Sequence, residues 1–170
     1  MRRGVERARG ESGGAMTRRV LATIALFAAG CQTTRVEEER ALARFYLETR
    51  GAGVEVSLPV SEVTLAIEAK PVLTEFDFVA VELAEVELGR CVLFRLTREA
   101  ARDLYRLTAA NQGRRLVLTI DGEAVGARPI EAPMGDGELL VFVEVSDAEL
   151  DALVRRLQQT TARVREEVKR

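Results

Sequence analysis

The stretch Cys91–Val145 constrains the fold most, because the spacing of its apolar residues changes from strand-like to helical and back. Apolar side chains occupy every second position from Val92 to Leu96, as one face of a β-strand requires. Thr97 can then cap a helix with its hydroxyl group. Apolar residues recur behind it at helical spacing, namely Ala100, Leu104 and Leu107. The first half of the stretch therefore predicts a strand followed by a helix.

The second half of that stretch predicts a β-hairpin and one more strand. Gly113 stands where a helix commonly ends in a left-handed residue. Alternation resumes over Leu116–Ile120, and Asp121-Gly122 suits a two-residue hairpin turn because both residues tolerate positive φ. We expect the return strand over Val125–Ile130 and a further strand over Leu139–Val145.

The preceding segment is expected to supply a helix and a pair of strands. A helix is expected over Glu37–Thr49, where four larger residues would share one helical face: Leu42, Phe45, Tyr46 and Thr49. Alternation over Val54–Val60 and Val63–Ala69 indicates two strands, joined as a hairpin around Val60–Glu62 or continuous as one bent strand. Pro59 cannot donate to a strand ladder, so the first strand should lie at an edge or end there.

The region before Cys91 is expected to contain a turn and a long strand. Thr74–Asp77 should form a turn or a single helical turn. The strand Val79–Leu88 changes phase between Leu83 and Val86, and one extra residue in a β-bulge there would keep its apolar groups on one face.

The last helix has a clear beginning. Ser146 and Glu149 form a capping box, in which a hydroxyl and a carboxylate satisfy amide donors at the helix start. A continuous apolar stripe runs from Leu150 to Val168, so the helix should extend from about Asp147 towards Arg165. These elements together predict an α+β domain with a largely antiparallel sheet packed by two or three helices.

Residues 1–30 have the organisation of an export signal. Met16 is expected to be the true start, and the apolar run Val20–Ala29 is shorter than the roughly 20 residues of a membrane helix. Ala28-Ala29-Gly30-Cys31 resembles the lipobox of bacterial lipoproteins, although Leu is usual where Ala28 stands. We expect Cys31 to carry the lipid and to become the mature N-terminus. An ordinary secretory signal and a buried N-terminal helix are the alternatives.

The charge of the remaining chain bears on its partner. Residues 1–30 contain six Arg and two Glu, which leaves 19 basic and 25 acidic residues and a net charge of −6. An acidic body argues against a nucleic-acid partner, because phosphate binding needs a basic face. Gln32 follows Cys31 in place of the Asp that often retains lipoproteins at the inner membrane, so the outer membrane is favoured over the inner.

Several segments in a fixed order resemble the head subdomain of the first periplasmic region of SecD, a protein-export accessory factor. The matching segments are Pro71-Val-Leu-Thr74, Val92-Leu-Phe-Arg-Leu-Thr97, Gly113-Arg-Arg115 and Leu116-Val-Leu-Thr-Ile-Asp-Gly122, with Pro129 and Ile130 closing the return strand. The resemblance covers about residues 71–158. It implies an extracytoplasmic α+β head of a kind that contacts polypeptide.

The departures from SecD limit what the resemblance implies. SecD has several membrane helices and a charged residue used in proton-driven export, and this chain has neither feature, so the motor function is not expected here. The expected organisation is a signal peptide over 1–30, a tether over 31–36, a helix and strand pair over 37–70, a SecD-head-like region over 71–160 and the end of the last helix over 161–170.

Reactive chemistry has little support in the sequence. The chain contains no His, which excludes Ser-His-Asp, Cys-His and His-containing metal sites. With Cys31 lipidated, Cys91 would be alone, and we expect it to be a small buried apolar residue. The carboxylates of Glu85 and Glu87 project from one strand face and are expected to be solvated. No catalytic residue, cofactor or metal is predicted.

These observations favour a non-enzymatic envelope lipoprotein that binds a protein partner or an exported polypeptide. The candidate binding edge is the first strand of the pair, with Val54, Val56 and Leu58, since a peptide can add to an exposed strand. One alternative is an assembly lipoprotein that self-associates through its last helix. A second is an envelope enzyme that uses carboxylates as acid and base.

Overall fold

The computed structural model describes residues 40–170, so the predicted signal peptide, the tether and Cys31 lie outside the described residues. The elements in chain order are β1 (Ala43–Leu47), β2 (Val54–Ser57), β3 (Thr64–Ile67), the 3-10 turn η1 (Glu75–Asp77), β4 (Phe78–Val86), β5 (Gly89–Leu96), α1 (Arg98–Ala110), β6 (Arg115–Ile120), β7 (Glu123–Pro129), β8 (Glu138–Val141) and α2 (Asp147–Val168). The α+β prediction with antiparallel sheets is confirmed, with two α-helices in this part of the chain.

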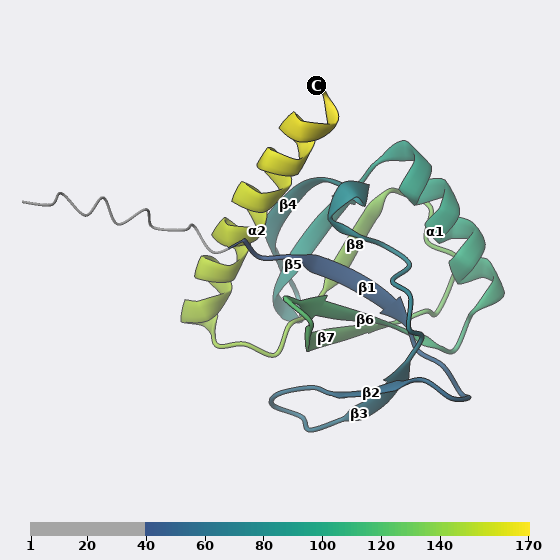
Figure 1. The fold of residues 1–170 in the computed structure, drawn as a ribbon. Helices are drawn as coiled ribbons and strands as arrows, with labels where there is room; N and C mark the ends of the chain where they lie inside the picture. Colours follow the sequence, from purple (N-terminus) through teal and green to yellow (C-terminus); the bar gives the residue numbers. More distant parts are fainter. Residues whose placement is uncertain (1–39) are drawn as a thin grey trace, which may run out of the picture. The chain divides into compact units, whose positions relative to one another are not determined.

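Two three-stranded antiparallel sheets form the centre of the fold (Figure 1). One has the order β1-β6-β7 and the other the order β4-β5-β8. In the first sheet Phe45 lies opposite Leu118, and in the second Phe94 lies opposite both Val81 and Leu139. The first strand of the described chain is therefore held by a strand from its middle.

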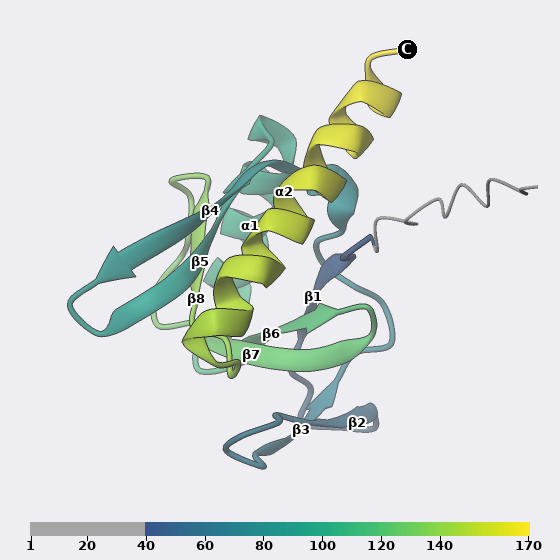
Figure 2. The same cartoon turned by 90° about the vertical axis from the view of Figure 1, so that its left-hand side faces the viewer.

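The main core lies between these sheets and the two helices. Three buried aromatic rings meet at its centre: Phe45 lies 5.2 Å from Phe94, and Phe94 lies 4.9 Å from Phe78, between ring centroids. Offset and edge-to-face rings at such separations add about 0.5–1.5 kcal/mol per pair beyond their burial. Both views place the sheets between α1 and α2, and α2 packs along β4 (Figures 1 and 2).

The hairpin β2–β3 covers a different face of the first sheet. Leu65 and Ile67 of β3 are buried in a second apolar cluster with Val117 of β6 and Ala124 of β7. The predicted hairpin is thus confirmed, with Val54 opposite Ile67 and a turn around Val60–Glu62.

Local signals in the sequence predicted the element boundaries well. The Thr97 hydroxyl accepts a hydrogen bond from the Ala100 amide at the start of α1, and Ser146 and Glu149 form the expected capping box at the start of α2. Asp121 and Gly122 both have positive φ in the β6–β7 turn. Thr74–Asp77 contains the expected single turn, η1.

The predicted helix over Glu37–Thr49 is wrong for the residues that the structure describes. Ala43–Leu47 forms strand β1, and its odd-numbered side chains are buried while the even-numbered ones are half-exposed. The segment pairs with β6 on one side, and the Phe45 amide donates to the Leu73 carbonyl at 2.9 Å. The apolar residues of this segment are spaced so that they fit one face of either a helix or a strand. Pairing with distant segments favours the strand.

The predicted β-bulge between Leu83 and Val86 is also wrong. Strand β4 pairs without interruption from Ala80 to Val86, and its irregularity lies between Phe78 and Ala80. The change of phase has a simpler origin, since Leu83 and Val86 are on opposite faces of β4 and each remains more than a third exposed.

Candidate functional site

The predicted binding edge on β2 is only partly open. Within the described residues β2 pairs with β3 alone, so its outer side forms no ladder. Val54 is exposed and Val56 is half-buried, whereas Leu58 is buried in the second cluster. The Leu58 side chain is therefore not available to a ligand, and the role of this edge stays a prediction.

Glu144 holds the tip of the β2–β3 hairpin from a distant part of the chain. Its carboxylate accepts hydrogen bonds from the amides of Val60 and Ser61, both at 2.8 Å, and from the Ser61 hydroxyl. Desolvation opposes the charged form, but these hydrogen bonds outweigh it and hold the pKa of Glu144 below its ordinary value. The hairpin is thereby tied to the segment after β8.

The two central sheets meet at β7 and β8 without a continuous ladder. Within residues 40–170 one backbone hydrogen bond joins β7 to the segment after β8, from the Glu144 amide to the Val125 carbonyl at 2.7 Å. Gly126 permits the close approach there, because a Cβ atom at this position would overlap the Phe142 carbonyl oxygen. Further along, the Arg128 side chain lies between the strands.

Arg128 takes the place of a backbone donor at this junction. Its Nη1 donates to the Leu140 carbonyl at 2.9 Å, while its buried Nε–H finds no acceptor in the part of the chain that the structure describes. A buried donor without a partner costs about 1–3 kcal/mol. Arg128 also lines a surface cavity, where a guanidinium can donate to a carbonyl group.

The cavity beside Arg128 has an apolar rim. Its volume is about 320 Å³, and we call it the Arg128 notch; it is lined by Leu88, Ala127, Arg128, Pro129, Glu131, Leu140 and Phe142. Leu88 is 85% exposed and Phe142 is 39% exposed. Apolar side chains around a few polar groups are typical of ligand pockets.

Cys91 lies near the same guanidinium but is buried, as the sequence predicted. Burial raises the pKa of the Cys91 thiol, and the charge of Arg128 partly opposes this rise. A thiol with a raised pKa is a poor nucleophile at neutral pH, so Cys91 fits a packing role.

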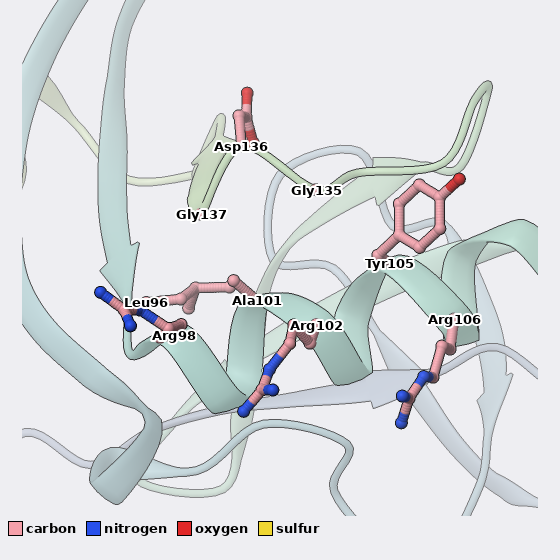
Figure 3. A pocket seen from close by; sticks show the side chains of 9 residues that line it. All are labelled: Leu96, Arg98, Ala101, Arg102, Tyr105, Arg106, Gly135, Asp136 and Gly137. Carbon is pink, nitrogen blue, oxygen red and sulfur yellow. The ribbon is translucent and has the colours of Figure 1, made fainter.

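A second hollow runs along α1. This groove has a volume of about 830 Å³, and we call it the α1 groove; it is lined by Leu96, Arg98, Ala101, Arg102, Tyr105, Arg106, Gly135, Asp136 and Gly137. In Figure 3 Arg102 and Arg106 point to one side of α1, and Tyr105 points to the other, towards the loop that carries Gly135. The α1 groove and the Arg128 notch share no lining residue.

Two of the carboxylates near these hollows have local partners. Glu131, Asp136 and Glu138 line a cavity of about 390 Å³ next to Arg128. Glu138 pairs with Arg95 at 3.1 Å, and Asp136 accepts a hydrogen bond from the Glu138 amide. No cluster of three metal-ligating side chains occurs among the described residues.

The apolar stripe of α2 packs against the rest of its own domain. Its residues are buried against the rest of the domain as far as Val164, and Val168 is exposed. The stripe motivated the hypothesis of self-association, and packing within the monomer now accounts for its burial. In residues 40–170, neither α1 nor α2 is long and apolar enough to cross a membrane.

Comparison of the whole fold with solved structures finds similar folds in SecDF. A structure of SecDF, described as a membrane component that enhances protein export, matches with a TM-score of 0.56 over 72% of this chain at 18% sequence identity. The chain has a SecDF-like fold. The super-membrane-facing form of SecDF gives a TM-score of 0.57 at 18% identity over 72% of the chain, and the translocon-associated SecDF of Thermus thermophilus gives 0.50 at 20% identity over 73%.

This chain spans only part of the length of the SecDF chains that it matches. The chain covers 64% of the first SecDF chain and 19% and 20% of the other two. No protein-family model and no curated protein matches the sequence. The resemblance to SecD expected from the sequence is thus confirmed for the fold.

Sequence reasoning did not single out either hollow of the SecDF-like domain. The arginines of α1 carry a visible signal, because Arg98, Arg102 and Arg106 are four residues apart and so share one helix face. Arg128 carries no such signal, since its role depends on the Leu140 carbonyl 12 residues later and on the separation of β7 from β8.

Proposed function

We propose that this chain is a lipid-anchored protein of the bacterial cell envelope whose SecDF-like domain binds an extended polypeptide segment at the Arg128 notch. The observation that carries the proposal is the junction of β7 and β8. There the strand ladder is interrupted, and the Arg128 side chain donates to the Leu140 carbonyl in place of a backbone amide. The likeness to SecDF, which is described as enhancing protein export, supports a role related to export.

The chemistry of the notch suits a polypeptide. A segment laid between the strands offers backbone carbonyls to the Arg128 guanidinium, and its apolar side chains meet Leu88 and Phe142. Such contacts accept many sequences, because backbone groups provide the hydrogen bonds and the apolar surface is not shaped for one residue type.

In vitro binding tests this proposal directly. Full-length protein is titrated against a fluorescent, reduced and carboxymethylated polypeptide that cannot refold, and anisotropy is measured. Replacing both Leu88 and Phe142 with Ser should weaken binding about tenfold, because partial burial of the two side chains together contributes on the order of 1–2 kcal/mol. Val63→Ser, at another exposed apolar position, is the matched control and should leave the affinity within twofold.

Crosslinking in intact cells locates the site. A photoreactive residue in place of Phe142 should give adducts with polypeptides, whereas the same residue in place of Val63 should give few. Strong adducts from position 54 with none from position 142 would move the site to the edge predicted from Val54 and Val56. Unchanged affinity of the Leu88/Phe142 double variant would refute the notch.

The lipid anchor is a separate part of the proposal. Cys31→Ser should abolish incorporation of a labelled fatty acid and release the protein from the membrane fraction, whereas Cys91→Ser should leave both unchanged because Cys91 is buried. Density separation of the two membranes tests the expected outer-membrane location. Labelling that persists in Cys31→Ser would exclude lipidation at this residue.

A further inference from the structure

The exposed side of α1 presents a row of like charge. Arg98, Arg102 and Arg106 line the α1 groove, and in Figure 3 the guanidinium groups of Arg102 and Arg106 extend to the side of α1 away from the loop, with Arg98 at the start of the helix. Four residues of α-helix rise 6 Å, so the row places a cation about every 6 Å along the groove.

The charges of this row are available to a ligand. Other arginines are paired with carboxylates, among them Arg44, Arg95 and Arg114. Arg98 and Arg102 have no ion pair or hydrogen bond among residues 40–170. Within the same residues Arg106 pairs only with Asp103, at 3.5 Å, and both side chains are more than three-quarters exposed. An exposed pair of this kind contributes little, so a ligand can recruit Arg106.

Hydrogen bonds hold the loop that lines the α1 groove opposite the helix. The loop over α1 is fixed by hydrogen bonds from the Met134 amide to the buried Thr108 hydroxyl at 2.9 Å and from the Leu96 amide to the Gly137 carbonyl at 2.8 Å. Gly135 lies directly against the Tyr105 ring, and a Cβ atom there would come within 2.9 Å of the ring. Tyr105 is 52% exposed and offers its remaining surface to a ligand.

We infer that the α1 groove binds an extended acidic segment of a protein partner, with carboxylates at every second position. Alternate residues of an extended strand are about 6.6 Å apart, which matches the spacing of the arginine row. Each carboxylate then meets one guanidinium, and the intervening side chains lie over Ala101 and Tyr105. This surface lies outside the Arg128 notch, so the inference goes beyond the proposed function.

Asp136 fixes which side of the segment is acidic. It lines the α1 groove on the loop opposite α1, and its carboxylate accepts a hydrogen bond from the Glu138 amide. Its negative charge would repel an acidic side chain of the bound segment. Acidic side chains are therefore directed to the arginine side, and an acidic cluster without alternation would place some of its charge against Asp136.

Peptide binding to the full-length protein tests the inference. The probe is a fluorescent nonapeptide with Glu at alternate positions and Thr between them, and the comparison probe has the same composition with its Glu residues contiguous. The alternating peptide should bind more tightly, and raising the salt concentration should weaken it. Arg102→Gln should reduce its affinity about tenfold, as expected for loss of a charge-assisted contact.

Arg155→Gln is the matched control, because Arg155 is an exposed arginine of α2 and the variant has the same net charge. It should leave the affinity within twofold, and so should the Leu88/Phe142 double variant of the notch. Equal losses from Arg102→Gln and Arg155→Gln would show a nonspecific charge effect and overturn the inference. Binding of oligothymidylate or of anionic phosphatidylglycerol vesicles with the same dependence on Arg102 would also overturn it. Circular dichroism of each variant confirms that the fold is retained.

Discussion

Arg44 and Glu75 connect the first strand to the turn before β4. Both guanidinium–carboxylate hydrogen bonds are 3.2 Å long, and the Glu75 side chain is mostly shielded from solvent. The hydrogen bond from Arg44 is the main cause that lowers the pKa of Glu75. A carboxyl group whose pKa is lowered by folding stabilises the protein above its unfolded pKa, and this stabilisation is lost as the pH falls through the folded pKa.

Glu75→Gln should therefore lower the stability at neutral pH and reduce the further loss of stability in acid. At pH 7 we expect a loss of about 0.5–1 kcal/mol, as is typical for partly exposed ion pairs. Between about pH 5 and pH 3 the wild-type protein should lose stability that the variant no longer has, so the difference between them should shrink. Urea denaturation across this pH range measures it, and a difference that grows on acidification would contradict the assignment.

At the scale of elements, the features predicted correctly were helix caps and a turn, which depend on residues close together in the sequence. Thr97, Ser146 and Asp121-Gly122 act within a few residues, and each behaves as expected. β1 was missed because its partner strand β6 follows long after it, and helical spacing fits Leu42 and Phe45 equally well. The Arg128 notch could not be predicted for the same reason, since it depends on where two sheets separate.

The junction of β7 and β8 gives a prediction at this scale. Gly126→Ala should destabilise the domain by about 1–3 kcal/mol, the usual cost of forcing atoms into a packed site, because the new Cβ would meet the Phe142 carbonyl. Gly51→Ala is the control, since its Cβ would find ordinary contact distances, and it should change stability by less than about 0.5 kcal/mol. Equal effects in thermal unfolding would mean that the strands do not approach closely at Gly126.

At the scale of the whole molecule, the two apolar clusters share the same strands. The main core contains Leu116 and Leu118 of β6, and the second cluster contains Val117 between them. The hairpin β2–β3 is also tied to the segment after β8 through Glu144. The clusters should therefore not unfold separately.

A fragment containing residues 40–170 should unfold in one cooperative transition, because both apolar clusters include residues of β6. Leu65→Ala in the second cluster and Phe45→Ala in the main core should each lower that same transition, by about 2–5 kcal/mol. Calorimetry and near-ultraviolet circular dichroism should give coincident curves. Two resolved transitions in the Leu65→Ala variant would show that the hairpin is an independent unit.

The pairing of β1 with β6 has a consequence for the living cell. Arg44 and Thr119 are 75 residues apart, yet they meet in adjacent strands. At a synthesis rate of 5–20 residues per second, β1 waits roughly 4–15 s before its partner strand exists. During that time Phe45 has no core to enter, so the newly made strand β1 remains unpaired and its apolar face stays exposed until β6 has been synthesised.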